Sequence, residues 1–144
     1  GYRYDSSLFP IRGHPTYGYP DGERDPYFLD RPAGRIVEVP PTTLRLAGRT
    51  LPAAGGAYFR FFPYGFIRAG LEQAARRGRR GTFYIHPWEL DDFEPPTTMP
   101  WRTRLRTFGR QGVTWPRLER LFRDFRFQPI ADTVRAMSPS APTP

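Results

Sequence analysis

Proline and glycine recur along the whole chain, and they limit how long any helix or strand in it can be. The 144 residues include 18 prolines and 14 glycines. Proline has no backbone N–H to donate to a helix or a β-ladder, and glycine loses more conformational entropy on ordering than any other residue. A chain of this length still buries about two-thirds of the surface that it exposes when unfolded. We therefore expect one domain of short elements joined by long loops.

The composition excludes several classes of protein and of site. No cysteine is present, which rules out disulfides, thiolate nucleophiles and thiolate metal ligands within the chain. No apolar run approaches the roughly 18 residues of a membrane span, so no span is expected. The net charge is +8, and all 22 basic residues are arginine. Coding composition explains an all-arginine set as easily as function does, so it favours anionic partners without indicating a nucleic-acid site.

Periodicity and turn signals predict two amphipathic helices among short strands. The helix over 63–77 starts at a proline and stops at Gly78, and the helix over 114–125 is capped by Thr114. The first helix followed by a strand at 82–85 predicts an αβ unit of a parallel sheet. Further strands are expected at 2–5, 35–39 and 44–46, with a short strand and turn over 127–134. Long loops are expected over 11–32 and from 86 to 113, and a disordered tail over 136–144. Because the chain begins at Gly1 inside an expected strand, we expect it to be a piece of a longer protein, whose N-terminal signal could lie upstream.

The segment Thr82–Glu89 is the strongest functional signal, because a β-type apolar run ends abruptly in His86, Trp88 and Glu89. In α/β folds, sites are built at the C-terminal ends of strands. A histidine there can serve as general acid or base near neutral pH. The alternative is a structural histidine bonded to a backbone carbonyl. Trp88 could stack on a sugar ring or belong to the core, and Glu89 could orient His86 or cap the next turn.

Other chemistry has little support in the residues. His14 and His86 have no carboxylate at metal-ligand spacing, so a complete metal site is not expected in this chain. The sequence has no glycine-rich phosphate loop and no Gly-x-Ser-x-Gly elbow. Ser6 and Ser7 have no identifiable base, so nucleophilic catalysis is not expected.

Four separated segments carry a resemblance to a known family. They are, in chain order, Tyr4–Pro10, Glu38–Arg45, Ala54–Arg60 and Phe83–Glu89. Together they resemble the C-terminal half of the exosortase-associated polysaccharide deacetylases, a branch of the NodB-homology carbohydrate deacetylases. The resemblance runs over nearly the whole chain, from Tyr2 to Val134.

The resemblance implies a fold and a reaction. The fold is α/β, the C-terminal part of a deformed (β/α) barrel with long Pro/Gly-rich loops, over residues 1–135. The reaction is hydrolysis of N-acetyl groups on an aminosugar polymer, in exopolysaccharide biosynthesis. In that family an upstream aspartate and two histidines bind a divalent metal, usually zinc, and a neighbouring aspartate acts as base. Those motifs do not occur here, so no cofactor is expected in this chain.

The same resemblance implies partners and a location. The polysaccharide substrate and a missing N-terminal half of the same protein are the expected partners, and the chain alone is expected to be inactive. No nucleic-acid partner and no membrane span are expected. Relatives tend to start directly at their catalytic motif, which implies a cytoplasmic protein.

The resemblance also assigns roles to residues. His86 matches the histidine that protonates the leaving amine, and Ile85 beside it forms a wall of the acetyl pocket. Tyr4 and Asp5 fall where the family's fourth motif lies, although its usual tryptophan pattern is absent there. The residues expected to contact the substrate are Ile85, Trp88, Glu89, Tyr58, Arg60, Gly55, Gly56 and Asp5.

Two other readings stay open. A carbohydrate-binding or assembly module without catalysis would use the aromatic loops and Arg60 to hold a glycan. An arginine-rich nucleic-acid binder would use the aromatic rings for base stacking. Weak binding to oligonucleotides at low salt would argue against the second reading.

Overall fold

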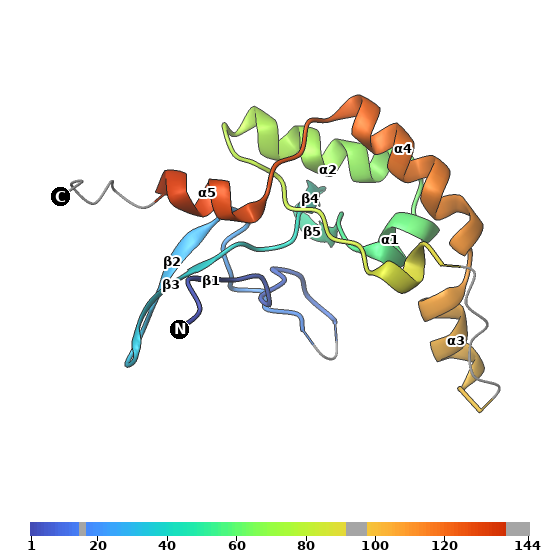
Figure 1. Ribbon diagram of the computed structural model, residues 1–144, viewed down its shortest axis with the longest axis horizontal. Coiled ribbons are helices and arrows are strands. Elements are labelled where there is room, and N and C mark those ends of the chain that lie inside the picture. Colours follow the sequence, from blue (N-terminus) through green and yellow to red (C-terminus); the bar gives the residue numbers. More distant parts are fainter. Residues whose placement is uncertain (15–16, 92–97, 138–144) are drawn as a thin grey trace.

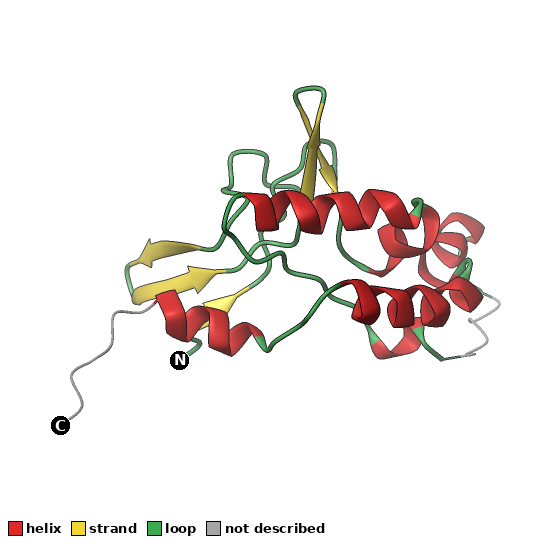
Figure 2. Cartoon of the chain, turned by 90° about the horizontal axis from the view of Figure 1, so that it is seen from above, coloured by secondary structure: helices red, strands yellow, loops and turns green. Residues whose placement is uncertain are grey.

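The computed structural model describes residues 1–14, 17–91 and 98–137, and its fold is mixed α/β with small sheets (Figure 1). A three-stranded sheet and helix α5 (Ile130–Met137) lie at one end of the molecule. Helices α1 (Gly56–Phe61) and α3 (Trp101–Phe108) lie at the other end. The two longer helices, α2 (Tyr64–Arg76) and α4 (Thr114–Asp124), lie side by side (Figure 2).

The three-stranded sheet has the order β1 (Tyr4–Asp5), β3 (Gly34–Glu38), β2 (Tyr27–Arg31). β1 pairs with β3 in parallel, and β2 and β3 form an antiparallel hairpin. Strands were predicted at 2–5 and 35–39, and both are confirmed. The prediction of an irregular loop over 11–32 is wrong at β2, because Pro26 and Pro32 flank that strand without interrupting its ladder.

A separate hairpin joins β4 (Thr43–Leu46) to β5 (Arg49–Pro52), and it confirms the strand predicted at 44–46. Its two turn residues, Ala47 and Gly48, have positive φ angles of 48° and 76°. Two consecutive residues of this kind match the right-handed twist of the flanking strands, as tight hairpin turns require.

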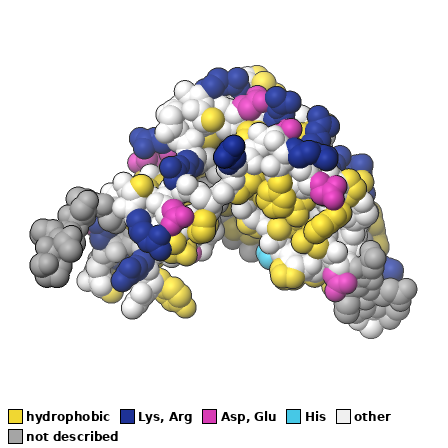
Figure 3. Space-filling model, turned by 45° about the horizontal axis from the view of Figure 1, so that its top comes forward, with side chains coloured by type: hydrophobic (Ala, Val, Ile, Leu, Met, Phe, Trp, Pro, Cys, Tyr) yellow, Lys and Arg dark blue, Asp and Glu magenta, His cyan; other side chains and the backbone are white. Residues whose placement is uncertain are grey.

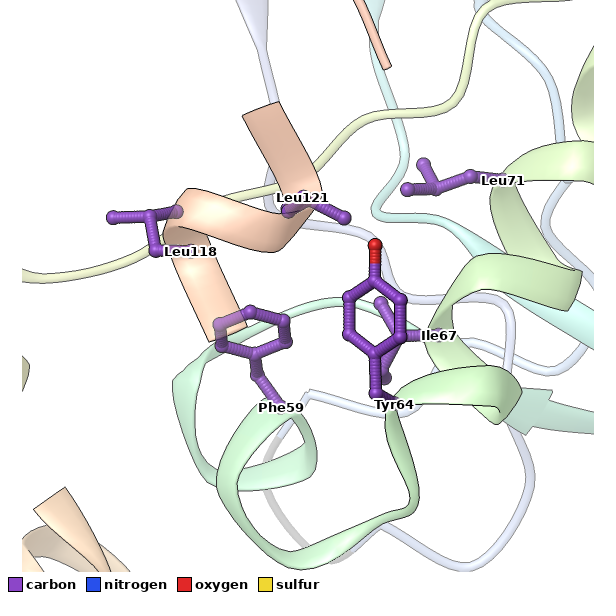
Figure 4. Close-up of a cluster of buried hydrophobic side chains, with 6 residues drawn as sticks. All are labelled: Phe59, Tyr64, Ile67, Leu71, Leu118 and Leu121. Carbon is purple, nitrogen blue, oxygen red and sulfur yellow. The ribbon is translucent and has the colours of Figure 1, made fainter. Parts of the chain in front are cut away.

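The main core lies where helices α1, α2 and α4 meet, and the helices predicted at 63–77 and 114–125 are confirmed as α2 and α4. Their apolar side chains interdigitate in one buried cluster (Figure 4), which consists of Phe59, Tyr64, Ile67, Leu71, Leu118 and Leu121. A second, smaller cluster joins α5 to the sheet through Val37, Val39 and Val134. Among the described residues, no helix combines the length and the apolar character that crossing a bilayer would need.

The segment predicted as a strand at 82–85 joins no sheet in the described part of the chain, so that prediction is wrong. Its backbone bonds a loop residue instead: the carbonyl of Thr82 accepts hydrogen bonds from the backbone N–H of Thr42 at 3.0 Å and from Thr42 Oγ1 at 2.8 Å. Phe83 packs against the main core, with its ring centroid 4.9 Å from that of Phe59. The αβ unit expected from helix 63–77 and this strand is therefore not formed within these residues.

Two further predictions are wrong because helices form where loop or strand was expected. Helix α3 occupies part of the loop predicted from 86 to 113, and Pro100 directly precedes its first turn. Helix α5 replaces the strand and turn predicted over 127–134, and its apolar side packs on the sheet through Val134. α5 ends at Met137, and the rest of the predicted tail lies outside the described residues.

Several arginines join separate segments instead of only facing solvent. Arg117 of α4 donates from Nη1 to the carbonyl oxygens of Phe59, Arg60 and Phe62, which end helix α1. Arg24 donates to the side chain and carbonyl of Thr43, at 2.8 and 2.9 Å, and so holds its loop against β4. Other arginines are scattered over the surface among few acidic side chains (Figure 3).

Candidate active site around His86

His86 is placed by the irregular segment that leads into a short 3₁₀ turn, Pro87–Glu89. A residue before proline is driven to an extended backbone, and His86 has φ −100° and ψ 149°. Proline then suits the first position of the turn, because its missing N–H would have no partner there. The turn closes when the N–H of Glu89 donates to the carbonyl of His86 at 3.0 Å. This turn brings the side chains of His86 and Glu89 to the same side.

The imidazole of His86 is held by a buried carboxylate. His86 Nδ1 lies 2.7 Å from Glu89 Oε1, and the backbone N–H of His86 donates to the same oxygen at 3.2 Å. The other oxygen of Glu89 forms an ion pair with Arg60 Nη1. Glu89 and Arg60 are 3% and 1% exposed, whereas the side chain of His86 is 45% exposed. His86 Nε2 makes no hydrogen bond to any described residue, so this nitrogen is the one available to a ligand.

Helix α1 begins at a glycine because the carboxylate occupies the space next to it. A Cβ built on Gly56 would overlap the carboxylate atoms of Glu89. Gly55 has φ +92°, and a Cβ there would collide with the hydroxyl of Tyr84. The Gly55–Gly56 pair therefore lets helix α1 approach the segment that carries His86.

Aromatic rings surround the imidazole. The indole of Trp88 stacks on His86, with ring centroids 4.2 Å apart and an angle of 19° between the planes. Tyr84 meets His86 edge to face at 5.6 Å. Burial raises the pKa of Tyr84 to about 12, so its hydroxyl stays protonated at neutral pH and can donate a hydrogen bond. Burial likewise raises the pKa of Tyr58.

These side chains line a pocket of about 160 Å³. Its walls come from the loop around Tyr17, the start of α1, the segment 84–89 and the end of α3. The lining residues are Tyr17, Gly56, Ala57, Tyr58, Arg60, Tyr84, His86, Trp88, Glu89, Arg106 and Thr107. A pocket with aromatic walls, a histidine and an exposed arginine, Arg106, can hold a polar ring and exchange a proton with it.

Most of the residues predicted to form the site do come together. His86, Trp88, Glu89, Tyr58, Arg60 and Gly56 all line the pocket, and Gly55 lies next to it against Tyr84. Asp5 does not line it: Asp5 is in β1, where Oδ1 accepts hydrogen bonds from the N–H of Ser6 and the hydroxyl of Ser7. Tyr4 lies beside Asp5 in that strand. Ile85 is partly buried and is not among the lining residues.

Five lining residues were not singled out as site residues in the sequence, namely Tyr17, Ala57, Tyr84, Arg106 and Thr107. Tyr17 belongs to the loop predicted over 11–32, and its ring stacks on Phe9 with centroids 6.5 Å apart. Arg106 and Thr107 lie in α3, and Arg60 Nη2 bonds both of their carbonyls from 46 and 47 residues away in the chain. No local sequence pattern predicts contacts between residues so far apart in the chain.

The described residues contain no group of three His, Asp or Glu side chains that could hold a metal ion. His14 stacks on Tyr17, with ring centroids 3.6 Å apart. The described residues therefore provide no ligand set for a metal ion, and His86 is the proton-carrying group of the pocket.

Comparison with known proteins identifies a family. The family described as "Domain of unknown function (DUF3473)" matches residues 6–135. No curated protein and no solved structure matches the chain at a significant level. Because the match covers most of the chain, the protein belongs to the DUF3473 family.

Proposed function

We propose that this chain supplies the proton-donating part of a polysaccharide N-deacetylase, which hydrolyses N-acetyl groups of an aminosugar polymer. The observation that supports this most is the His86 ring itself. One of its nitrogens is fixed by a buried carboxylate, and the other is free at a pocket with aromatic walls. We further propose that the chain is the C-terminal part of a deformed (β/α) barrel of the NodB type, as the four motifs imply.

The chemistry assigns His86 one step. In amide hydrolysis the oxygen of water bonds to the acetyl carbon while a base takes a proton from that water, and the carbon–nitrogen bond breaks. The departing amine is a poor leaving group unless its nitrogen receives a proton. Protonated His86 would deliver that proton from Nε2 and become neutral. Glu89 accepts the Nδ1 hydrogen bond throughout, which orients the ring.

The walls of the pocket suit a sugar ring. Aromatic side chains present flat apolar faces together with polar edges, and Tyr17, Tyr58, Tyr84 and Trp88 all line the pocket. The Tyr84 hydroxyl, protonated at neutral pH because burial raises its pKa to about 12, can donate to a sugar or acetyl oxygen.

The described residues contain no group of three His, Asp or Glu side chains for the metal that the family motifs imply. We propose that the metal ligands and the base belong to a segment outside this chain. The chain alone is then expected to release no acetate, whereas the full-length protein is active.

The test is acetate release from N-acetylglucosamine oligomers by the full-length protein that contains this chain. His86→Ala should lower turnover by roughly a hundredfold or more, with KM little changed, because the variant loses the proton donor but keeps the aromatic walls. Unfolding by urea confirms that the variant is folded. Deacetylation by this variant at a near-normal rate would remove His86 from the mechanism.

A non-catalytic glycan-binding role is the second candidate, and the aromatic lining of the pocket favours it equally. The same oligomers distinguish the two functions. A full-length protein that binds them and releases no acetate, with or without His86, would be a binding module.

A further inference from the structure

Arg60 joins three parts of the site from a fully buried position. Its Nη1 is paired with Glu89 Oε2, its Nε donates to the carbonyl of Gly109 at 2.9 Å, and its Nη2 donates to the carbonyls of Arg106 and Thr107 at 2.9 Å each. Arg60 is 1% exposed and lies on the far side of Glu89 from the imidazole. Its donors are therefore engaged with the protein, which is a poor arrangement for a substrate contact.

We propose that Arg60 is a positioning residue that acts on His86 through Glu89 and does not itself contact the substrate. A carboxylate as buried as Glu89 stays ionised only if a cation compensates the loss of solvent, and Arg60 is a cation in contact with it whether or not His86 is protonated. An ionised carboxylate only accepts hydrogen bonds. The proton of neutral His86 must then sit on Nδ1, which leaves the lone pair on Nε2, at the pocket.

The same guanidinium fixes a wall of the pocket relative to the histidine. The carbonyls of Arg106 and Thr107 belong to the last turn of α3, where the helix dipole favours a positive charge. Both residues also line the pocket. One side chain thus sets the distance between His86 and the α3 wall.

Lysine cannot replace all of these functions. Its ammonium is a single point charge, whereas the planar guanidinium donates in several fixed directions. Arg60→Lys should therefore keep Glu89 ionised and lose the α3 contacts. Arg60→Met removes both functions at similar length.

The first experiment measures which nitrogen of His86 carries the proton, by ¹⁵N NMR of the full-length protein at a pH where the imidazole is neutral. We expect the Nδ1–H tautomer in the wild type and in Arg60→Lys. In Arg60→Met we expect the Nε2–H tautomer or a mixture of the two tautomers. Glu89 without its cation becomes protonated, and its hydroxyl then donates a hydrogen bond to an Nδ1 that carries no proton. Arg104→Met, an exposed arginine of α3, is the control and should match the wild type. A wild-type tautomer in Arg60→Met overturns the proposal.

The second experiment is a double-mutant cycle with Glu89→Gln, and only this part rests on the proposed deacetylase function. Arg60→Met should lower kcat by about 10- to 100-fold in the wild-type background and raise KM by a smaller factor, because the α3 wall of the pocket loses its contacts. In the Glu89→Gln background the same change should alter kcat by less than about twofold, because its effect passes through Glu89. Equal factors in the two backgrounds, or a loss confined to KM, would show that Arg60 acts elsewhere.

The two experiments separate the possible failures. Arg60→Met alone leaves a buried unpaired carboxylate. If it does not fold for this reason, the double variant Arg60→Met/Glu89→Gln is compared with Glu89→Gln. The tautomer of His86 and kcat in these two variants then test the role of Arg60. If the full-length protein has no deacetylase activity, the proposed function fails. The tautomer measurement then still decides the role of Arg60.

Discussion

At the scale of single residues, Gly56 shows how closely the site depends on one missing methyl group. A Cβ at this position would overlap the Glu89 carboxylate. We predict that Gly56→Ala destabilises the protein by about 1–3 kcal/mol, because the carboxylate must move out of its buried place. Urea unfolding measures the difference.

Gly65 is the matched control for this prediction. It lies in the first turn of α2, and a Cβ there would meet nothing within 4 Å. Gly65→Ala should be neutral or stabilising by up to about 1 kcal/mol, since alanine has less conformational freedom to lose. Equal effects of the two substitutions would contradict the close approach of α1 to Glu89.

Residues of the site were predictable where they are neighbours in the sequence. His86, Trp88 and Glu89 meet because one short turn joins them, and the end of an apolar run announces that turn. The glycine pair at 55–56 indicates that another segment lies close to the backbone there, but it does not indicate which segment. Arg106 and Thr107 were not predictable as pocket walls, because their place depends on how helices far apart in the sequence pack together.

At the scale of elements, helices with one apolar face were predicted correctly, and the segment at 82–85 was not. Helical periodicity reports burial of one face, which α2 and α4 achieve against each other and α1. A β-type run needs a neighbouring strand as well, and the described residues provide none for 82–85. Helix α5 was missed because its few apolar residues also fit a strand, and contact with the sheet decides between the two.

The sheet element contains a buried carboxyl that makes stability depend on pH. Glu38 is fully buried in β3, Leu8 N–H donates to its Oε1 at 3.0 Å, and its Oε2 has no hydrogen-bond partner among the described residues. Burial raises the pKa of Glu38 above its usual 4.5; the nearby Asp5 adds to this rise, and the Leu8 hydrogen bond opposes it. The folded state thus binds the proton more tightly than the unfolded state. Glu38 therefore favours folding at low pH and disfavours it as pH rises through the raised pKa.

We predict that Glu38→Gln is more stable than the wild type near neutral pH and closely similar to it at about pH 4.5, near the usual Glu pKa of 4.5. Glutamine keeps the acceptor for Leu8 without the buried charge. Urea unfolding at the two pH values measures this. Glu72→Gln, which removes an exposed partner of Arg68 on α2, should change the free energy of unfolding by at most about 0.5 kcal/mol at either pH. A constant difference between Glu38→Gln and the wild type across this range would contradict the assignment.

At the scale of the whole molecule, one hydrophobic cluster supports the pocket and the other supports the sheet. The larger cluster includes Phe59, the neighbour of Arg60 in α1. The smaller cluster fastens α5 to β3 through Val134. The candidate site should therefore depend on the first cluster and tolerate weakening of the second.

We predict that Leu121→Ala costs about 2–5 kcal/mol and that Val134→Ala costs about 1.5 kcal/mol. Leu121 is fully buried against α1 and α2, whereas Val134 is 8% exposed. Hydrogen exchange followed by mass spectrometry should show faster exchange over 56–61 in the first variant and over 130–137 in the second. Faster exchange over 56–61 in Val134→Ala would mean that the clusters are not independent.

The arginines that clasp carbonyl oxygens have a consequence for any attempt to re-engineer the chain. Exchanging every arginine for lysine would leave the formal charge of +8 untouched. It would nevertheless remove the guanidinium groups by which Arg60 and Arg117 hold the ends of α3 and α1. The original protein and the all-lysine variant would carry the same charge, yet only the original would keep the shape of the pocket beside His86.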